Sequence, residues 1–153
     1  MKNLLLMIML AMSSLSAGMA SAQTPEKLVS EVRAAAEDSC VTVRYSMTAR
    51  VDDVVIEDSG TVVAQDSLWY LKGETIEIFT SHEGTWILHL EAKEAIVEPQ
   101  WTYDDLEAFY KTLLSSSGNV VNVRIVSKEL SEKKPLSSFV PSAGSDWVVT
   151  DLR

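Results

Sequence analysis

The residues able to perform covalent chemistry are few in this chain. Cys40 is the only cysteine, and His82 and His89 are the only histidines. A nucleophilic thiol needs a base beside it, and nothing in the sequence brings either histidine to Cys40. A cysteine also packs well as a small apolar side chain. We therefore expect Cys40 to be buried where a helix meets a strand, and an enzyme that uses Cys40 is the weakest of three alternatives.

Other sequence features that could carry catalysis have structural explanations. The sequence contains no glycine-rich phosphate loop, no histidine pair at helical spacing and no nucleophile elbow. His82 falls in a predicted turn, and His89 in a predicted strand, on the face opposite Trp86. The acidic pairs Asp52-Asp53 and Asp104-Asp105 suit a turn and a helix start. We predict a protein that is not an enzyme and needs no cofactor or metal.

The N-terminal segment has the pattern of a secretory signal. Lys2 supplies the positive end, residues 4–12 the apolar core, and Ala20 to Ala22 a small-residue cleavage site. Such a core is too short for a membrane-spanning helix, which needs about 20 apolar residues. Met19 stands where a lipoprotein signal would carry cysteine. We expect cleavage after Ala22, export to the periplasm and one domain over residues 23–153.

Composition excludes some classes of partner. The formal net charge is −9, and the only charged residue of the signal segment is Lys2. Nucleic acids and anionic membrane surfaces favour clusters of Lys and Arg, so we expect neither as a partner. A single cysteine allows no internal disulfide in an oxidising compartment. The remaining residues suit a soluble, monomeric single domain.

Short apolar runs separated by turn residues predict a β-meander. The central stretch, residues 60–99, holds four such runs, and residues 41–51 alternate apolar and polar side chains six times. A bulge or bend is expected at Asp58-Ser59-Gly60. Residues 129–138 read as a polar loop with a solvated Lys133-Lys134 pair. The strands are expected at residues 41–51, 54–65, 68–72, 75–81, 85–90, 95–99, 120–126 and 147–152.

Two of these strands lack the alternation of a strand with one wet face. Leu68, Trp69, Tyr70 and Leu71 are all apolar, and so are the residues around Trp86. Strands that face water on one side alternate apolar and polar residues. We therefore expect apolar cover on both faces of this sheet.

Two helices could supply such cover. Thr24 and Pro25 predict a helix start, and apolar residues at spacings of three and four continue the helix to Asp38. Thr102, with Asp105 three residues on, resembles a capping box. The stripe that follows contains Leu106, Phe109, Tyr110, Leu113 and Leu114, and it is the most apolar helix face expected beyond the signal segment.

The aromatic content suggests an apolar pocket. Aromatic residues recur through the predicted sheet and the second helix, and a curved sheet beneath an apolar helix encloses more space than a two-layer core requires. A concave apolar pocket is the usual site for a lipophilic ligand. The alternative is that the helices fill the concave face by themselves.

Several segments together resemble the LolA-like outer-membrane lipoprotein carrier proteins. They are Gly60 to Gln65, the aromatic run Leu68 to Leu71, the segment that ends in Gly84-Thr85-Trp86, residues 93–97, and the tail around Phe139 and Trp147 to Arg153. The turn Gly84-Thr85-Trp86 is the most specific of these motifs. One departure is Ala64-Gln65-Asp66, where the family often has a basic residue and proline, so no gating arginine is transferred.

The resemblance implies an α+β fold, an unclosed antiparallel β half-barrel of about seven or eight strands with helices covering the concave face. It also implies a periplasmic chaperone that carries the acyl chains of lipoproteins, or another apolar ligand, between inner- and outer-membrane lipoprotein-sorting proteins. The ligand-binding residues implied by position are Tyr45, Met47, Trp69, Leu71, Ile76, Ile78, Trp86, Leu88, Leu106, Phe109 and Leu113. The second alternative is an envelope interaction or sensor domain of the same fold without a transported ligand.

Overall fold

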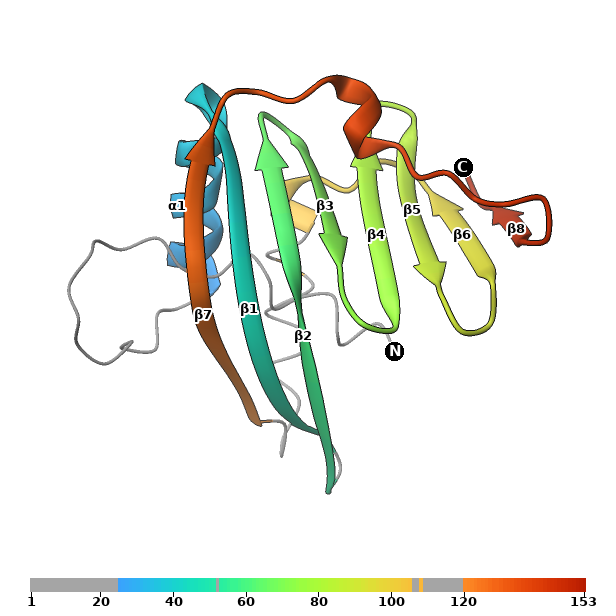
Figure 1. Ribbon diagram of the computed structural model, residues 1–153, viewed down its shortest axis with the longest axis horizontal. Coiled ribbons are helices and arrows are strands. Elements are labelled where there is room, and N and C mark those ends of the chain that lie inside the picture. Colours follow the sequence, from blue (N-terminus) through green and yellow to red (C-terminus); the bar gives the residue numbers. More distant parts are fainter. Residues whose placement is uncertain (1–24, 52, 106–107, 109–119) are drawn as a thin grey trace.

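The computed structural model describes residues 25–51, 53–105, 108 and 120–153 (Figure 1). The expected signal segment lies outside these residues, as do Leu106, Phe109 and Leu113. Helical conformation is also assigned to residues 103–105 and 108. The elements, in chain order, are α1 (Pro25–Asp38), β1 (Cys40–Val51), β2 (Val54–Gln65), β3 (Leu68–Lys72), β4 (Ile76–Ser81), β5 (Gly84–His89), β6 (Glu94–Glu98), β7 (Val120–Ser131), the 3-10 turn η2 (Leu136–Phe139) and β8 (Val148–Asp151).

The strands form one sheet in the order β7-β1-β2-β3-β4-β5-β6-β8. Strands β1 to β6 pair in sequence order and antiparallel, which confirms the predicted meander. The two outer strands, β7 and β8, lie at opposite ends, so the sheet is unclosed and the fold is α+β. The expectation of a wholly antiparallel sheet is wrong, because β8 pairs parallel with β6.

Tight turns join the meander. Asp53, Asp66 and Lys93 have φ values of 66°, 53° and 53°, the left-handed conformation that closes a short hairpin and that Asp tolerates better than most residues. The pairing of β1 with β2 runs without a register shift, so the expected bulge around Asp58 is absent from this ladder. The irregularity lies instead between β1 and β7, at Arg44/Tyr45.

Helix α1 packs against β1 and β2. Its sequence is amphipathic, with Val32 and Ala36 buried and Arg33 and Glu37 exposed. The chain leaves the helix at Ser39, whose backbone N–H and side-chain hydroxyl both donate to the Ala35 carbonyl. Cys40 then begins β1 with no exposed surface, as predicted for a buried cysteine at a helix–strand junction.

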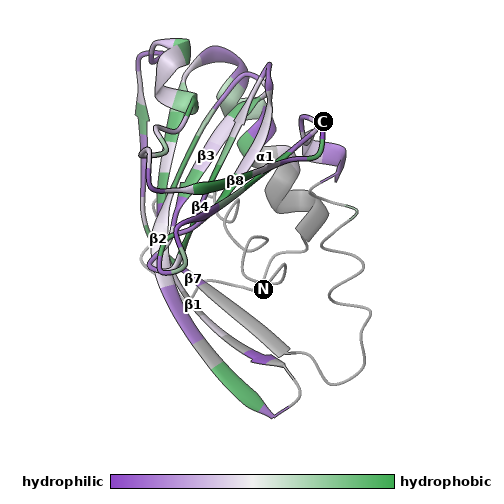
Figure 2. Cartoon of the chain, turned by 90° about the vertical axis from the view of Figure 1, so that its right-hand side faces the viewer, coloured by the Kyte–Doolittle hydropathy of each residue, from purple (hydrophilic) through white to green (hydrophobic). Residues whose placement is uncertain are grey.

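The two faces of the sheet carry different covers. Directly paired residues point to the same face, so each ladder row can be assigned to one side. We call the side that bears α1 the α1 face, and Figure 2 shows α1 to one side of the sheet. The row that contains Leu71 and Ile78 belongs to it. The opposite side, which contains Tyr70 and Phe79, is the strap face.

Residues 132–147, which we call the strap, lead from β7 at one edge toward β8 at the other (Figure 1). The predicted polar loop over residues 129–138 is therefore only partly right. Strand β7 continues to Ser131, and η2 turns Phe139 into a cluster with Cys40, Val63 and Leu68. A single aromatic side chain thus makes this polar segment part of the core.

Asp66 ties together segments that are distant in sequence. Its backbone N–H donates to the Ala36 carbonyl of α1 at 2.6 Å, and its carbonyl accepts from the Tyr103 hydroxyl at 2.9 Å. Its carboxylate accepts from Lys133 of the strap at 2.6 Å. Lys133 also donates to the Glu37 carbonyl, so this lysine is a tether and not a solvated loop tip.

Within the part of the chain that the structure describes, no helix combines the length and apolar character needed to cross a bilayer.

Candidate functional site

An unbroken apolar row crosses the α1 face. Its members pair strand by strand from β1 to β6, and most are almost fully buried, with Ile78 at 0% exposure and Ile87 at 9%. Neighbouring strands are about 4.8 Å apart, so a row over six strands extends roughly 24 Å. In strand order, the row is Val43, Val62, Leu71, Ile78, Ile87 and Ile96.

The next row on the α1 face, two residues along each strand, carries polar groups. It runs Ala64, Trp69, Thr80, Thr85 and Glu98. The Thr80 hydroxyl accepts from the backbone N–H of Trp69 at 2.9 Å and donates to the Trp69 carbonyl at 3.0 Å. The Thr85 hydroxyl accepts from the Trp101 N–H at 2.8 Å. The face therefore changes from apolar to hydrogen-bonded within one row.

A buried Tyr–Asp pair lies at the other end of the α1 face. The Tyr45 hydroxyl donates to Asp58 Oδ2 at 3.0 Å, and the two residues are 2% and 7% exposed. Burial and the neighbouring Asp58 carboxylate raise the pKa of Tyr45, so its phenol stays protonated. A Cβ atom on Gly60 would stand 2.6 Å from the Tyr45 hydroxyl, which explains why glycine is the residue that fits there.

A second buried tyrosine lies near the C-terminal end of α1. Tyr103 is 4% exposed, and Arg33 of α1 lies over its ring at 5.3 Å. Burial raises the pKa of Tyr103, and the charge of Arg33 opposes this. The predicted capping box is confirmed, since the Thr102 hydroxyl accepts from Asp105 N–H at 3.1 Å and Asp105 accepts from Thr102 N–H at 2.7 Å.

The structure brings together five of the predicted ligand-binding residues on the α1 face. They are Tyr45, Trp69, Leu71, Ile76 and Ile78, each at most 4% exposed. Met47 pairs with Asp58 and Val123. It stands two residues from Tyr45 along β1, so its position belongs to the same face of the sheet. Leu106, Phe109 and Leu113 lie outside the described residues.

Trp86 and Leu88 do not lie with that group. Trp86 pairs with Phe79 and Leu88 pairs with Glu77, so both point to the strap face. The prediction placed both residues on the same cavity as Trp69, whereas the structure places them on the opposite face of the sheet. Every residue of β5 from Thr85 to Leu88 is at least half-buried. The sequence of β5 therefore does not alternate between apolar and polar residues, and it could not show which side chains point to which face.

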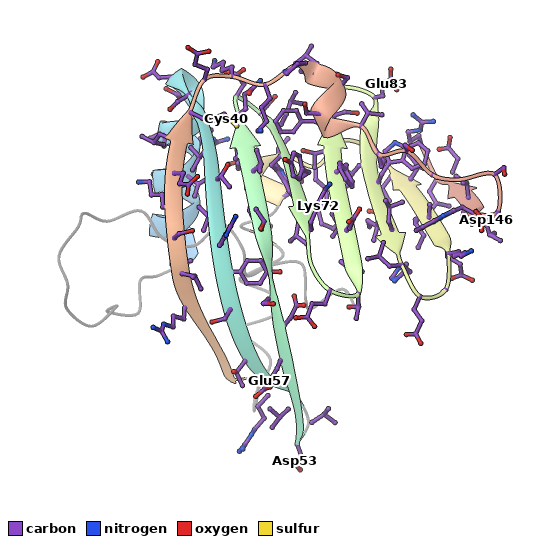
Figure 3. All side chains as sticks on the ribbon, viewed as in Figure 1. Cys40, Asp53, Glu57, Lys72, Glu83 and Asp146 are labelled. Carbon is purple, nitrogen blue, oxygen red and sulfur yellow. The ribbon has the colours of Figure 1, made fainter. Side chains whose placement is uncertain are left out.

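The strap face is covered in part by residues that were not among the predicted ligand-binding residues. Phe139 is fully buried, and its ring lies 5.5 Å from that of Tyr70, which in turn stacks on Phe79 at 5.5 Å. Trp147 packs on the cluster of Phe79, Leu88 and Ala95. Lys72, labelled in Figure 3, lies over the Tyr70 and Phe79 rings at 5.6 and 5.8 Å.

The strap is also held by polar contacts. The buried Gln65 side chain donates to the Lys134 carbonyl at 2.9 Å and accepts from the Lys134 N–H at 2.6 Å. At the far end, Asp146 forms an ion pair with Lys93 in the β5–β6 turn. Figure 3 shows Cys40 and Asp146 toward opposite ends of this arrangement. These contacts hold the strap near both of its ends.

The residues able to perform covalent chemistry lie far apart in the structure. Cys40 is buried in the strap-face cluster, His89 is half-buried on the α1 face and His82 is exposed in a turn. Across the described residues, no three His, Cys, Asp or Glu side chains converge as metal ligands would. What the α1 face offers is an apolar surface with a few hydrogen-bonding groups at each end, which suits non-covalent binding.

Comparison with models of known protein families and with curated protein sequences finds no match for this chain.

Proposed function

We propose that this protein binds an acyl chain or a similar elongated apolar ligand on the α1 face, beneath helices that cover the concave side of the sheet. In this proposal it is a periplasmic carrier of the lipoprotein-sorting type, which receives an acylated cargo and releases it without covalent chemistry. Its partners would be the acyl chains of lipoproteins and the sorting proteins of the inner and outer membranes.

The observation that carries the proposal is the apolar row from Val43 to Ile96. It crosses six strands, about 24 Å at the usual strand spacing. The hydrocarbon core of a bilayer is about 30 Å thick and holds two acyl chains end to end, so one chain needs roughly 15 Å. The row is long enough for an acyl chain to lie across the strands.

The contrast between the faces adds support. The strap covers the opposite face with Phe139 and Trp147, so that face has no need of further apolar cover. Helix α1 packs against β1 and β2, at one side of the α1 face. Under the proposal, a ligand occupies the remaining part of this face.

The second candidate is an envelope interaction or sensor domain with no transported ligand. One observation favours it: Trp69, Leu71 and Ile78 are already 2%, 2% and 0% exposed within the chain itself. A self-filled core of this kind would bury the same side chains with nothing bound.

Uptake of a fluorescent acyl probe by the purified, delipidated protein separates the two candidates. The variants to compare are Ile87→Thr and Leu88→Thr, which change neighbouring buried residues of β5 that point to the α1 face and the strap face. Each should lower stability by roughly 1–3 kcal/mol. Only Ile87→Thr should also weaken probe binding, by about tenfold, because a hydroxyl would enter the apolar row.

Both variants are measured at a temperature where circular dichroism shows them folded. Mass spectrometry of solvent extracts from the native protein provides a second, independent reading. No co-purifying lipid together with no probe uptake by the wild type would eliminate the carrier proposal in favour of the sensor domain. Equal loss of binding in both variants would place the ligand elsewhere.

A further inference from the structure

The indole N–H of Trp69 is a buried donor without an acceptor. Trp69 is 2% exposed and is the largest fully buried side chain identified in the core. Within the described part of the chain, its Nε1 is the buried side-chain nitrogen or oxygen that has no hydrogen-bond partner. Buried polar groups are nearly always paired, so an unpaired donor at the centre of a sheet calls for an explanation.

The polar groups in the same ladder row are already committed. The Thr80 hydroxyl both donates to and accepts from the Trp69 backbone, at 3.0 and 2.9 Å. The Thr85 hydroxyl accepts from Trp101 N–H, and the Glu98 carboxylate accepts from Trp101 Nε1 at 3.0 Å. The row therefore fixes the Trp69 backbone and leaves its indole N–H unused.

A phenylalanine would fill an apolar core without this cost. An unpaired buried donor is unfavourable by about 1–3 kcal/mol, and an indole donates a hydrogen bond but cannot accept one. The missing partner must therefore be an acceptor. The row contains no cationic side chain and ends at Glu98, so a carboxylate brought here would be a buried charge with a single donor.

We infer that the ligand of the α1 face carries a neutral acyl carbonyl, of an ester or an amide, which accepts a hydrogen bond from Trp69 Nε1. The inference rests on the proposed function and adds to it the group of the ligand that the protein recognises, the carbonyl, and the residue that binds this group, Trp69. The carbonyl end lies at the row of Trp69 and Thr80, and the hydrocarbon runs along the neighbouring row of Leu71 and Ile78.

Two probes that differ only in this carbonyl test the inference. One is a monoacylglycerol with a 14-carbon ester chain, and the other is the glycerol ether with the same chain. The wild-type protein should bind the ester about five- to tenfold more tightly than the ether, as expected for one buried hydrogen bond. In Trp69→Phe, which keeps an aromatic ring but lacks the N–H, the ratio of the two affinities should fall to about one.

A measurement on the wild type keeps the test decisive even where Trp69→Phe fails to fold. The ester should shift the Trp69 indole N–H resonance of the ¹⁵N-labelled protein downfield, and the ether should not. Equal wild-type affinity for the two probes, or an indole resonance whose chemical shift does not change with the ester, would overturn the carbonyl inference and leave the carrier proposal intact. Binding of neither probe would remove the carrier proposal itself.

Discussion

The two faces of the sheet are covered by different parts of the chain, one by the strap and the other in part by α1. On the strap face, Phe139 and Trp147 of the strap pack on the strands, and Gln65 holds the strap backbone. The α1 face places α1 on β1 and β2 and carries the long apolar row, the Tyr45–Asp58 pair and the unpaired indole of Trp69.

Under the proposed function, the strap face contributes stability and the α1 face binds the ligand. Every buried side-chain nitrogen or oxygen described on the strap face has a hydrogen-bond partner, as expected for a surface whose role is structural. The unpaired donor lies on the α1 face, where a ligand can supply what is missing. An unsatisfied buried group is rare in a native fold and calls for an explanation, which under the proposal is the ligand.

The largest effect is expected from Phe139→Ala. This ring is fully buried between Cys40, Val63 and Leu68, so its removal should cost about 3–5 kcal/mol in the free energy of unfolding, measured by urea denaturation. Leu136→Ala, in the same η2 turn but 58% exposed, is the matched control and should change stability by at most about 0.5 kcal/mol. Loss of acyl-probe uptake in folded Phe139→Ala would show that the two faces are not independent.

The next effect belongs to the α1 face. Tyr45→Phe removes a hydrogen bond to a buried carboxylate and should cost about 2 kcal/mol at neutral pH. The folded-state pKa of Tyr45 lies above its unfolded value of about 10, so its contribution is present below that pH and is lost as the pH rises further.

Tyr103, whose pKa is also raised, acts in the same direction. Stability should therefore fall above pH about 10, by up to about 1.4 kcal/mol per pH unit for each of the two tyrosines. Urea denaturation from about pH 8 to about pH 11 measures how the free energy of unfolding changes with pH. Tyr45→Phe should reduce this dependence. An unchanged slope in Tyr45→Phe would contradict the assignment.

A smaller loss is expected from the strap tether. Gln65→Leu keeps the approximate size of the side chain but removes both hydrogen bonds to the Lys134 backbone. Because that backbone is only half-buried, the expected cost is about 1 kcal/mol by urea denaturation. Amide exchange at Phe139 should become faster while exchange in α1 stays the same. Faster exchange confined to α1 would reverse the roles given to the two faces.

The smallest effect should come from Lys133→Ala. The Lys133–Asp66 pair is 41% and 50% exposed at its two side chains, and exposed ion pairs contribute at most about 1 kcal/mol. The loss should shrink further in high salt, which screens exposed charges. A loss as large as that of Phe139→Ala would mean that polar contacts, and not the buried ring, hold the strap.

Local pattern predicted the meander well. Strand β3 begins and ends at the predicted residues, Leu68 and Lys72, and β1 differs by one residue, because alternation and turn residues are properties of the segment itself. The capping box at Thr102 was predicted for the same reason. The antiparallel arrangement of β1 to β6 follows from these elements and their short connections.

Long-range features could not be read in the same way. Phe139 lies between Ser138 and Val140 in a short irregular segment, and Trp147 follows Asp146, so neither belongs to a periodic pattern that indicates which face it covers. The parallel pairing of β8 with β6 depends on where the strap ends. The unused donor of Trp69 is visible only once its neighbours are in place, because Thr80 and Thr85 are distant from it in sequence but adjacent in the sheet.

The most direct test of the central claim is hydrogen exchange, followed by mass spectrometry, of the delipidated protein with and without a long-chain monoacylglycerol. Ligand binding should slow exchange in α1 and in the strands that carry the apolar row, and it should leave exchange in the strap at Leu136 to Phe139 unchanged. Slower exchange in the strap with none in α1, or no difference at either place, would contradict the assignment of the α1 face as the binding face.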